Sequence, residues 1–144
     1  MTLFQRAVHS ISDEFYTAVQ REAWAPVSPD YDSWRKKFDQ SKPYICLVNE
    51  KIAGFIELNQ EGYIDCLYVD PNFQCQGVAS YLYHYVEELA LARNNERLSV
   101  DASKVAKNFF IKKGFTVVRE NQVMRYGVVL ENFSMQKDLV LKQD

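Results

Sequence analysis

The sequence predicts one α+β domain whose sheet is mostly antiparallel. Its 144 residues are the length of a single ordinary domain, and no repeat, low-complexity tract or linker divides them. Short strand-like runs follow one another across tight turns, which is typical of antiparallel pairing. One long amphipathic segment in the middle adds a strand–helix–strand unit.

Composition and charge narrow the class of protein. Hydrophobic residues make up 47% and charged residues 25%, as in globular proteins. A net charge of −2 argues against nucleic acid as a partner. No apolar run approaches the ~20 residues of a membrane span, and the first residues, MTLFQRAVHSISDEF, lack the apolar region of a secretory signal. Three cysteines without C-x-x-C spacing predict neither disulfides nor a metal site, so we expect a cytoplasmic protein.

The N-terminal part is predicted to alternate between a strand and short helices. Thr2–Ala7 is expected to form a strand, followed by a helix to about residue 23 that Ser10 or Ser12 would cap. Two prolines then end that helix, because each disfavours helix in the residue before it. Residues 30–39 have the spacing of a second short helix.

The central part has the clearest pattern. Strands are predicted at Tyr44–Asn49, Ile52–Leu58 and Tyr63–Val69, with turns between them. The longest helix is predicted at Gly77–Arg93, because its apolar residues recur at helical spacing.

The C-terminal part is predicted to complete the sheet. Leu98–Ala102 has the pattern of a strand, and Val105–Lys113 that of a helix ended by a glycine. The last two strands are expected at Phe115–Arg119 and Val128–Gln136.

The segment that carries chemistry lies where the third central strand meets the long helix. The strand stops at Asp70-Pro71, a short loop follows, and the helix begins at Gly77. The start of a helix presents free N–H groups and the positive end of its dipole, which suits a pyrophosphate. Gly77 has no side chain to keep a phosphate away from the backbone, and Ala79 is small.

Two motifs in this chain resemble those of the GNAT acetyltransferases. Gln74-Cys75-Gln76-Gly77-Val78-Ala79 is similar to the family loop [RQ]-x-x-G-x-[GA], and it follows the L-Y-V-x-P strand end at 67–71. Residues 103–115 resemble the family pattern N-x-x-A-x-x-[FL]-Y-x-x-x-G-F. The resemblance covers nearly the whole chain. It implies one GNAT domain over 1–144, with a mixed sheet of about six or seven strands flanked by about four helices.

The resemblance also implies an activity and a cosubstrate. A GNAT enzyme of this kind would move an acetyl group from acetyl-CoA to a primary amine of a small molecule or peptide, by direct attack in a ternary complex. No metal is implied. Homodimers are frequent in the family, and the oligomeric state of this chain is left open. The pantetheine arm would lie between splayed central strands, and the pyrophosphate on the loop and helix start. The implied cosubstrate residues are Leu67, Tyr68, Val69, Gln74, Cys75, Gln76, Gly77, Val78, Ala79, Ser80, Ser103, Asn108 and Phe110.

Catalysis needs a base, because an ammonium group has no lone pair with which to attack a thioester. Asp65 is the first candidate, two residues before Leu67 on the strand beside the cosubstrate, and Glu57 on the neighbouring strand is the second. An Asp with a pKa near ~3.9 is a weak base, so burial would have to raise that pKa. Alternatively, both are ordinary sheet residues, or both attract a cationic substrate.

The acid is not assigned by the sequence. Many family members place a Tyr four residues before the Gly-Phe pair, and this chain has Phe110 there. Ser103 likewise replaces the usual Asn. Tyr126 is an alternative donor, or solvent protonates the thiolate, since a free thiol has a pKa of only ~8.5.

Aromatic residues are expected to wall the substrate cleft, where they would suit an amine with an apolar body. They are Trp24, Tyr31, Trp34, Tyr126 and Phe133. The alternative is that they pack in the core. The missing tyrosine also leaves open a non-catalytic acyl-CoA-binding module, whereas the absence of G-x-x-x-x-G-K-[ST] and G-x-G-x-x-G disfavours a nucleotide-binding domain.

Overall fold

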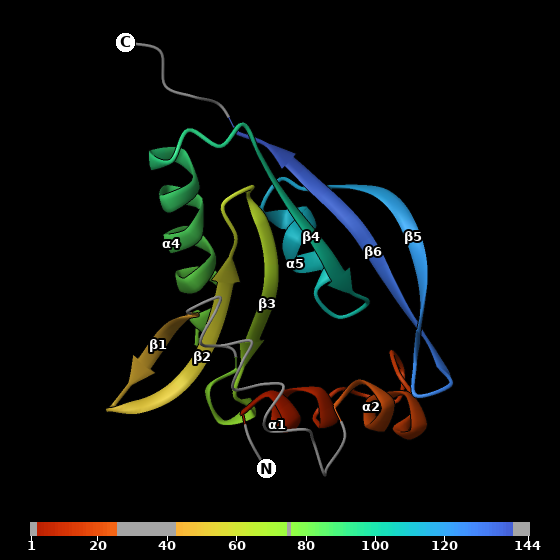
Figure 1. The fold of residues 1–144 in the computed structure, drawn as a ribbon. Coiled ribbons are helices and arrows are strands. Elements are labelled where there is room, and N and C mark those ends of the chain that lie inside the picture. The colour runs from red at the N-terminus through yellow and green to blue at the C-terminus, as the bar shows by residue number, and fades with distance from the viewer. Residues whose placement is uncertain (1–2, 26–42, 75, 140–144) are drawn as a thin grey trace.

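The computed structural model describes residues 3–25, 43–74 and 76–139, and Figure 1 shows a curved sheet with helices against it. The predicted helix at 30–39 lies outside these residues. The elements are α1 (Leu3–His9), α2 (Ala18–Trp24), β1 (Tyr44–Val48), β2 (Lys51–Leu58), β3 (Tyr63–Val69), α4 (Val78–Ala92), β4 (Arg97–Ser103), α5 (Lys107–Lys112), β5 (Thr116–Arg125) and β6 (Val128–Asp138).

In the described part of the chain, the sheet has six strands in the order β1-β2-β3-β4-β6-β5. Every neighbouring pair is antiparallel except β3 and β4, which α4 connects as a parallel crossover. This confirms the predicted α+β class and its mixed, mostly antiparallel sheet. Within the described ranges, no helix combines the length and the apolar character needed to cross a membrane.

The predicted first strand is wrong, because Leu3–His9 is a helix. Gln5 and Val8, one turn apart, are both buried, which is the burial of a helix lying on a surface. That surface is β3, where the Phe4 ring lies 4.7 Å from the Tyr68 ring.

The predicted second element is also wrong at its start. Helix α2 begins at Ala18, not near Ser10 or Ser12. Thr17 and Gln20 form a capping box: the Thr17 hydroxyl accepts from the Gln20 N–H, and the Gln20 side chain accepts from the Thr17 N–H. The T-x-x-Q signal was available in the sequence and was missed.

The C-terminal hairpin is longer than predicted. β5 runs on to Arg125, and its turn consists of Tyr126 and Gly127, both with positive φ (50° and 75°), as in a two-residue hairpin turn. Because β5 is an edge strand with most side chains exposed, it lacks the alternation that marks a half-buried strand.

Helices cover opposite faces of the central strands. Gly54 faces α4, and a Cβ there would lie 3.1 Å from a Val78 methyl and 2.8 Å from the Tyr68 carbonyl oxygen. Neighbouring side chains on a strand point to opposite faces, so Phe55 faces away from α4. Its ring lies 5.6 Å from that of Tyr68, on the side that carries α1 and α2 (Figure 1).

Candidate active site

A β-bulge lies in the middle of β3. Ile56 pairs with Leu67 and Leu58 pairs with Ile64, so two residues of β3, Asp65 and Cys66, lie opposite one residue of β2, Glu57. The bulge brings one ligand-type atom from each of these three side chains within 4.8 Å of the others. The register of β2 and β3 accounts for the proximity of these three side chains. Their proximity is therefore not evidence of a bound metal.

β3 and β4 separate just beyond this point. Their parallel pairing consists of Tyr63 with Ser99 and Ile64 with Val100, and no further pair joins these two described strands. The edge of β3 from Asp65 to Val69 therefore faces a gap, because its other edge is bonded to β2. An extended ligand could lie in this gap and bond to the backbone of β3.

A cavity of about 250 Å³, which we call the inter-strand cavity, occupies this gap. Its wall comes from α1, α2, β3, β4, the start of α4 and α5, and most of it is apolar. Seven residues that the sequence assigned to the cosubstrate line it: Leu67, Tyr68, Val69, Gln74, Ala79, Ser103 and Phe110.

The other residues assigned to the cosubstrate lie apart from this wall or outside the described chain. Gly77 caps α4 in the left-handed region (φ 79°), and a Cβ there would meet no atom within 4 Å. Val78 is buried in the core, whereas Gln76 and Asn108 are exposed. Ser80 is half-buried in the first turn of α4, and Cys75 lies outside the described residues.

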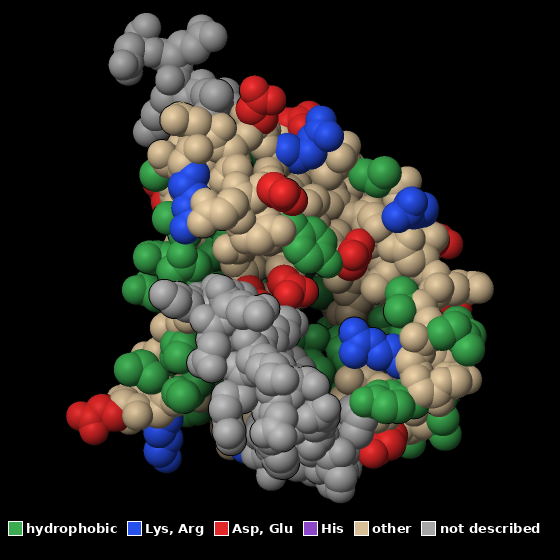
Figure 2. All heavy atoms as spheres, viewed as in Figure 1, with side chains coloured by type: hydrophobic (Ala, Val, Ile, Leu, Met, Phe, Trp, Pro, Cys, Tyr) green, Lys and Arg blue, Asp and Glu red, His purple; other side chains and the backbone are tan. Residues whose placement is uncertain are grey.

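A second cavity of about 260 Å³, which we call the hairpin cavity, lies beside β5 and β6. Figure 2, viewed as Figure 1, shows a hollow near the middle of the molecule, bordered by acidic, basic and hydrophobic side chains. The cavity is more polar than the first. It is lined by Tyr16, Trp24, Tyr63, Asp65, Tyr68, Asp101, Ser103, Val123, Arg125, Leu130, Glu131 and Asn132.

Hydrogen bonds fix several groups of the hairpin cavity. Asp101 accepts from the Tyr63 hydroxyl at 3.0 Å and from the Ser134 hydroxyl at 2.8 Å. Burial and the Asp101 carboxylate both raise the pKa of Tyr63, so its hydroxyl stays protonated.

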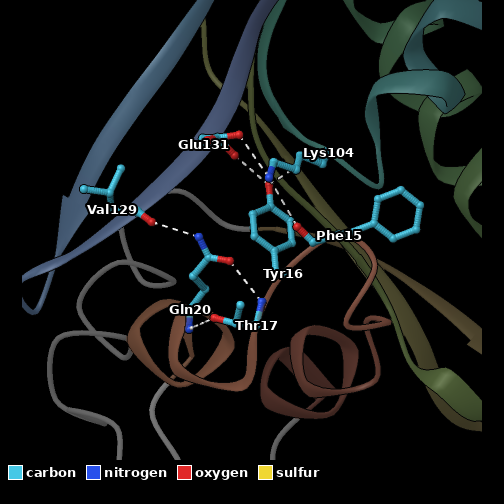
Figure 3. A network of polar contacts seen from close by, with 7 residues as sticks. All are labelled: Phe15, Tyr16, Thr17, Gln20, Lys104, Val129 and Glu131. Atoms are coloured by element: carbon cyan, nitrogen blue, oxygen red, sulfur yellow. Dashed lines mark hydrogen bonds and ion pairs between the residues drawn. The ribbon is translucent and has the colours of Figure 1, made fainter.

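Tyr16, which lines the hairpin cavity, joins three segments of the chain (Figure 3). Its hydroxyl donates to the Glu131 carbonyl oxygen at 2.6 Å and accepts from the Lys104 N–H at 2.9 Å. The Lys104 ammonium pairs with the Glu131 carboxylate at 3.0 Å. Nearby, the Gln20 side chain donates to the Val129 carbonyl oxygen, which holds α2 against β6.

The two cavities adjoin at a junction, defined by the residues that line both. They are Trp24, Asp65, Tyr68, Asp101 and Ser103. At the junction, the Trp24 indole N–H donates to the Tyr68 hydroxyl at 3.2 Å. A molecule in one cavity could therefore reach a molecule in the other.

The two predicted carboxylates lie side by side in different surroundings. Asp65 is exposed and lines both cavities, so the burial that the base argument required of it is absent. Glu57 is 2% exposed and is not among the residues lining either cavity. The bulge explains the difference, because the extra residue turns Asp65 toward the junction.

The predicted aromatic wall is found only in part. Trp24 lines both cavities, whereas Tyr126 lies at the tip of the β5–β6 hairpin with 76% of its surface exposed. Phe133 packs against the core. Tyr31 and Trp34 lie outside the described residues.

Sequence reasoning missed eight residues that line the hairpin cavity: Tyr16, Tyr63, Asp101, Val123, Arg125, Leu130, Glu131 and Asn132. They come from five separate segments and belong to no motif.

Comparisons with known proteins agree with this geometry. The family model described as Acetyltransferase (GNAT) domain matches residues 11–139. The chain belongs to the GNAT family of acetyltransferases. A relative from Escherichia coli K12, the uncharacterized N-acetyltransferase YafP, is 36% identical over 134 residues, which are 93% of this chain and 84% of that protein.

Solved structures share the fold. A GCN5-related N-acetyltransferase from Rhodopseudomonas palustris is 31% identical and superimposes with a TM-score of 0.90, over 95% of this chain and 86% of the other. The PaiA N-acetyltransferase of Thermoplasma acidophilum, solved in complex with coenzyme A, has a TM-score of 0.74 at 15% identity, over 95% and 89% of the two chains. Family membership makes this GNAT protein an acetyltransferase with acetyl-CoA as cosubstrate, which favours the enzyme over the non-catalytic module.

Proposed function

We propose that this GNAT enzyme transfers the acetyl group to a primary amine of a small molecule or peptide, by direct attack in a ternary complex. The junction between the two cavities is the observation that carries the proposal. A thioester in the inter-strand cavity and an amine in the hairpin cavity would meet there, held in the geometry of attack. No covalent intermediate on the enzyme is needed.

The pantetheine arm would lie along β3 in the inter-strand cavity. Beyond Ile64, the edge of β3 that faces β4 has no strand partner there, so Leu67 and Val69 offer backbone groups to the amides of the arm. The apolar wall suits the methylene groups between those amides, and Phe110 would pack beside them.

The pyrophosphate would rest on the segment from Gln74 to Ser80. The start of a helix has free N–H groups, no side chain caps those of α4, and a Cβ at Gly77 would meet no atom within 4 Å. The first turn of α4 has no acidic side chain that would repel phosphate. Ser103 and Asn108 would border the pantetheine arm and the nucleotide of coenzyme A.

The acceptor amine would enter through the hairpin cavity. Asp65, Asp101 and Glu131 carry carboxylates on its wall, and these attract an ammonium group. Trp24 adds an aromatic surface beside the junction, which favours a cation with an apolar body. A volume of about 260 Å³ suits a small amine or the end of a peptide chain.

The assignment of Asp65 as the group that takes the proton from the attacking amine rests on position alone, because Asp65 lines both cavities but is exposed in the absence of substrate. The amine nitrogen forms the new C–N bond, its proton passes to the carboxylate directly or through water, and the C–S bond breaks. Glu57 lies beside Asp65 but is not among the residues lining either cavity, and it is the second candidate for this role.

The test is release of free coenzyme A from acetyl-CoA in the presence of amines. A panel of polyamines, amino acids, aminoglycosides and peptides should contain at least one acceptor that gives saturable turnover. Mass spectrometry of the product should show one added acetyl group on nitrogen. Binding of acetyl-CoA without turnover on any of these amines would overturn the acceptor class proposed here.

A further inference from the structure

The position where many GNAT enzymes carry a tyrosine has no hydroxyl group in this chain. Phe110 is 1% exposed and packs edge-on against Phe109 and Phe115, with ring centroids 5.2 and 5.0 Å away. It lines the inter-strand cavity but cannot donate a hydrogen bond. If a protein hydroxyl assists the departing thiolate, it must come from elsewhere.

Among the described residues, three tyrosines line the two cavities, and two of their hydroxyl protons are already donated to other groups. Tyr16 donates to the Glu131 carbonyl oxygen, and Tyr63 donates to the Asp101 carboxylate. The Tyr68 hydroxyl instead accepts, from Trp24, and no acceptor for its own proton is found among the described residues. Tyr68 is also the one of the three that lines both cavities.

The Tyr68 ring is held in place by its neighbours. Its centroid lies 4.7 Å from that of Phe4 in α1, 5.6 Å from that of Phe55 in β2 and 6.2 Å from that of Trp24 in α2. The Trp24 N–H fixes one lone pair of the hydroxyl oxygen. The remaining O–H is therefore held at the junction before any substrate arrives.

We propose that the Tyr68 hydroxyl donates a hydrogen bond to the thioester sulfur as it departs, in place of the tyrosine that Phe110 replaces. The proposal rests on the proposed function, which places the thioester at the junction. The C–N bond forms, the C–S bond breaks with its electron pair going to sulfur, and the Tyr68 hydroxyl stabilises the developing negative charge. The thiolate then takes its proton from solvent, while the amine proton leaves through Asp65.

The surroundings of Tyr68 keep the hydroxyl protonated. Burial is the largest cause that raises the pKa of Tyr68, and the neighbouring Cys66 and Asp65 groups raise it further. The Trp24 hydrogen bond and the Arg125 charge from β5 lower it less. The net pKa lies above the ordinary tyrosine value, so the hydroxyl stays protonated and can donate at neutral pH.

The first test compares Tyr68→Phe with the matched control Tyr83→Phe. Tyr83 is a buried tyrosine of α4 that lines neither cavity among the described residues, and its hydroxyl accepts from Lys137. Tyr68→Phe should lower kcat on the order of 100-fold, with little change in KM for acetyl-CoA, whereas Tyr83→Phe should keep kcat. Equal kcat in wild type and Tyr68→Phe would overturn the inference and leave the proposed function intact.

A second test separates a hydroxyl donor from a packing role. Fluorinated tyrosines at position 68 keep the ring shape and lower the pKa of the hydroxyl. An alkaline limb in the pH profile of kcat should appear and move to lower pH as fluorines are added. A profile that does not move would overturn the inference even if Tyr68→Phe is inactive. No turnover by the wild type on any amine would overturn the proposed function and this inference together.

Discussion

The Arg6 guanidinium in α1 binds the Asp70 carboxylate at the end of β3, 64 positions later. Arg6 Nε lies 3.1 Å from the same carboxylate oxygen, and the other oxygen accepts from the Asn72 N–H at 3.0 Å. Asp70 is 3% exposed. One buried carboxylate therefore ties α1 to the turn that leads into the loop before α4.

The Arg6–Asp70 pair predicts loss of stability in acid. Burial alone would raise the pKa of Asp70, but hydrogen bonds from Arg6 and Asn72, with the Arg6 charge, lower it overall. Because the folded pKa lies below the unfolded value of about 3.9, this stabilisation is present at neutral pH. It is lost as the pH falls below about 4 and through the lower folded value.

Urea unfolding of wild type and Asp70→Asn between pH 7 and pH 3 measures this contribution. The variant should lose about 1–2 kcal/mol of unfolding free energy at pH 7, and the difference should shrink in acid. Asp13→Asn removes an exposed pair with Arg21 and should change little, since the Asp13 side chain is 85% exposed. A difference that is constant down to pH 3 would contradict the assignment.

The hydrogen bonds of the Tyr16 hydroxyl, at the wall of the hairpin cavity, predict that its removal lowers the free energy of unfolding. Tyr16→Phe removes the shared partner of the Glu131 carbonyl and the Lys104 N–H, and Tyr16 itself is 2% exposed. We expect a loss of about 1–3 kcal/mol, because buried polar groups lose a partner. Tyr81→Phe, at a residue 69% exposed on α4, is the control and should unfold like the wild type. Equal unfolding midpoints for all three proteins would contradict this role.

The proposed role of Asp65 predicts that its substitution lowers kcat without weakening the binding of acetyl-CoA. Asp65→Asn keeps the size of the side chain but cannot accept the amine proton, so kcat should fall on the order of 100-fold while the acetyl-CoA Kd changes little. Asp138→Asn is the control, since Asp138 is exposed at the end of β6 and pairs with Arg97. If the turnover of Asp65→Asn equals that of the wild type at every pH, Asp65 has no part in the mechanism. The same assays on Glu57→Gln test the second carboxylate.

Local patterns predicted the central part of the fold and failed near the N-terminus. The predicted bounds match those of β3, and they match α4 to within one residue at each end. There the alternation in β3, the helical spacing in α4, and the Asp-Pro and Gly residues between them all agree. Residues 3–9 are too few to show a helical period, and their burial depends on contact with β3. Packing against β3, and not the local sequence pattern, therefore determines that residues 3–9 form a helix.

Motifs predicted residues of the inter-strand cavity but few of those that line the hairpin cavity. Seven of the thirteen cosubstrate assignments line one cavity, because the loop and strand that carry them are contiguous in sequence. Asp101 and Arg125 reach the hairpin cavity through strand register. The bulge that distinguishes Asp65 from Glu57 is likewise a property of strand pairing. A homodimer, which is frequent in the family, remains a prediction.

The central claim is that the start of α4 holds the pyrophosphate of acetyl-CoA, and Gly77→Glu tests it. Glutamate adds bulk and negative charge at that point. Gly127→Glu is the matched control: Gly127 also has positive φ and open space around a Cβ, but it lies at the hairpin tip. Both variants carry similar backbone strain of about 1–2 kcal/mol.

Calorimetric titration of acetyl-CoA into the three folded proteins is the most direct measurement. The account predicts saturable binding to the wild type and to Gly127→Glu, and no binding to Gly77→Glu. Equal affinity of Gly77→Glu and wild type, or no binding of millimolar acetyl-CoA to the wild type, would contradict it.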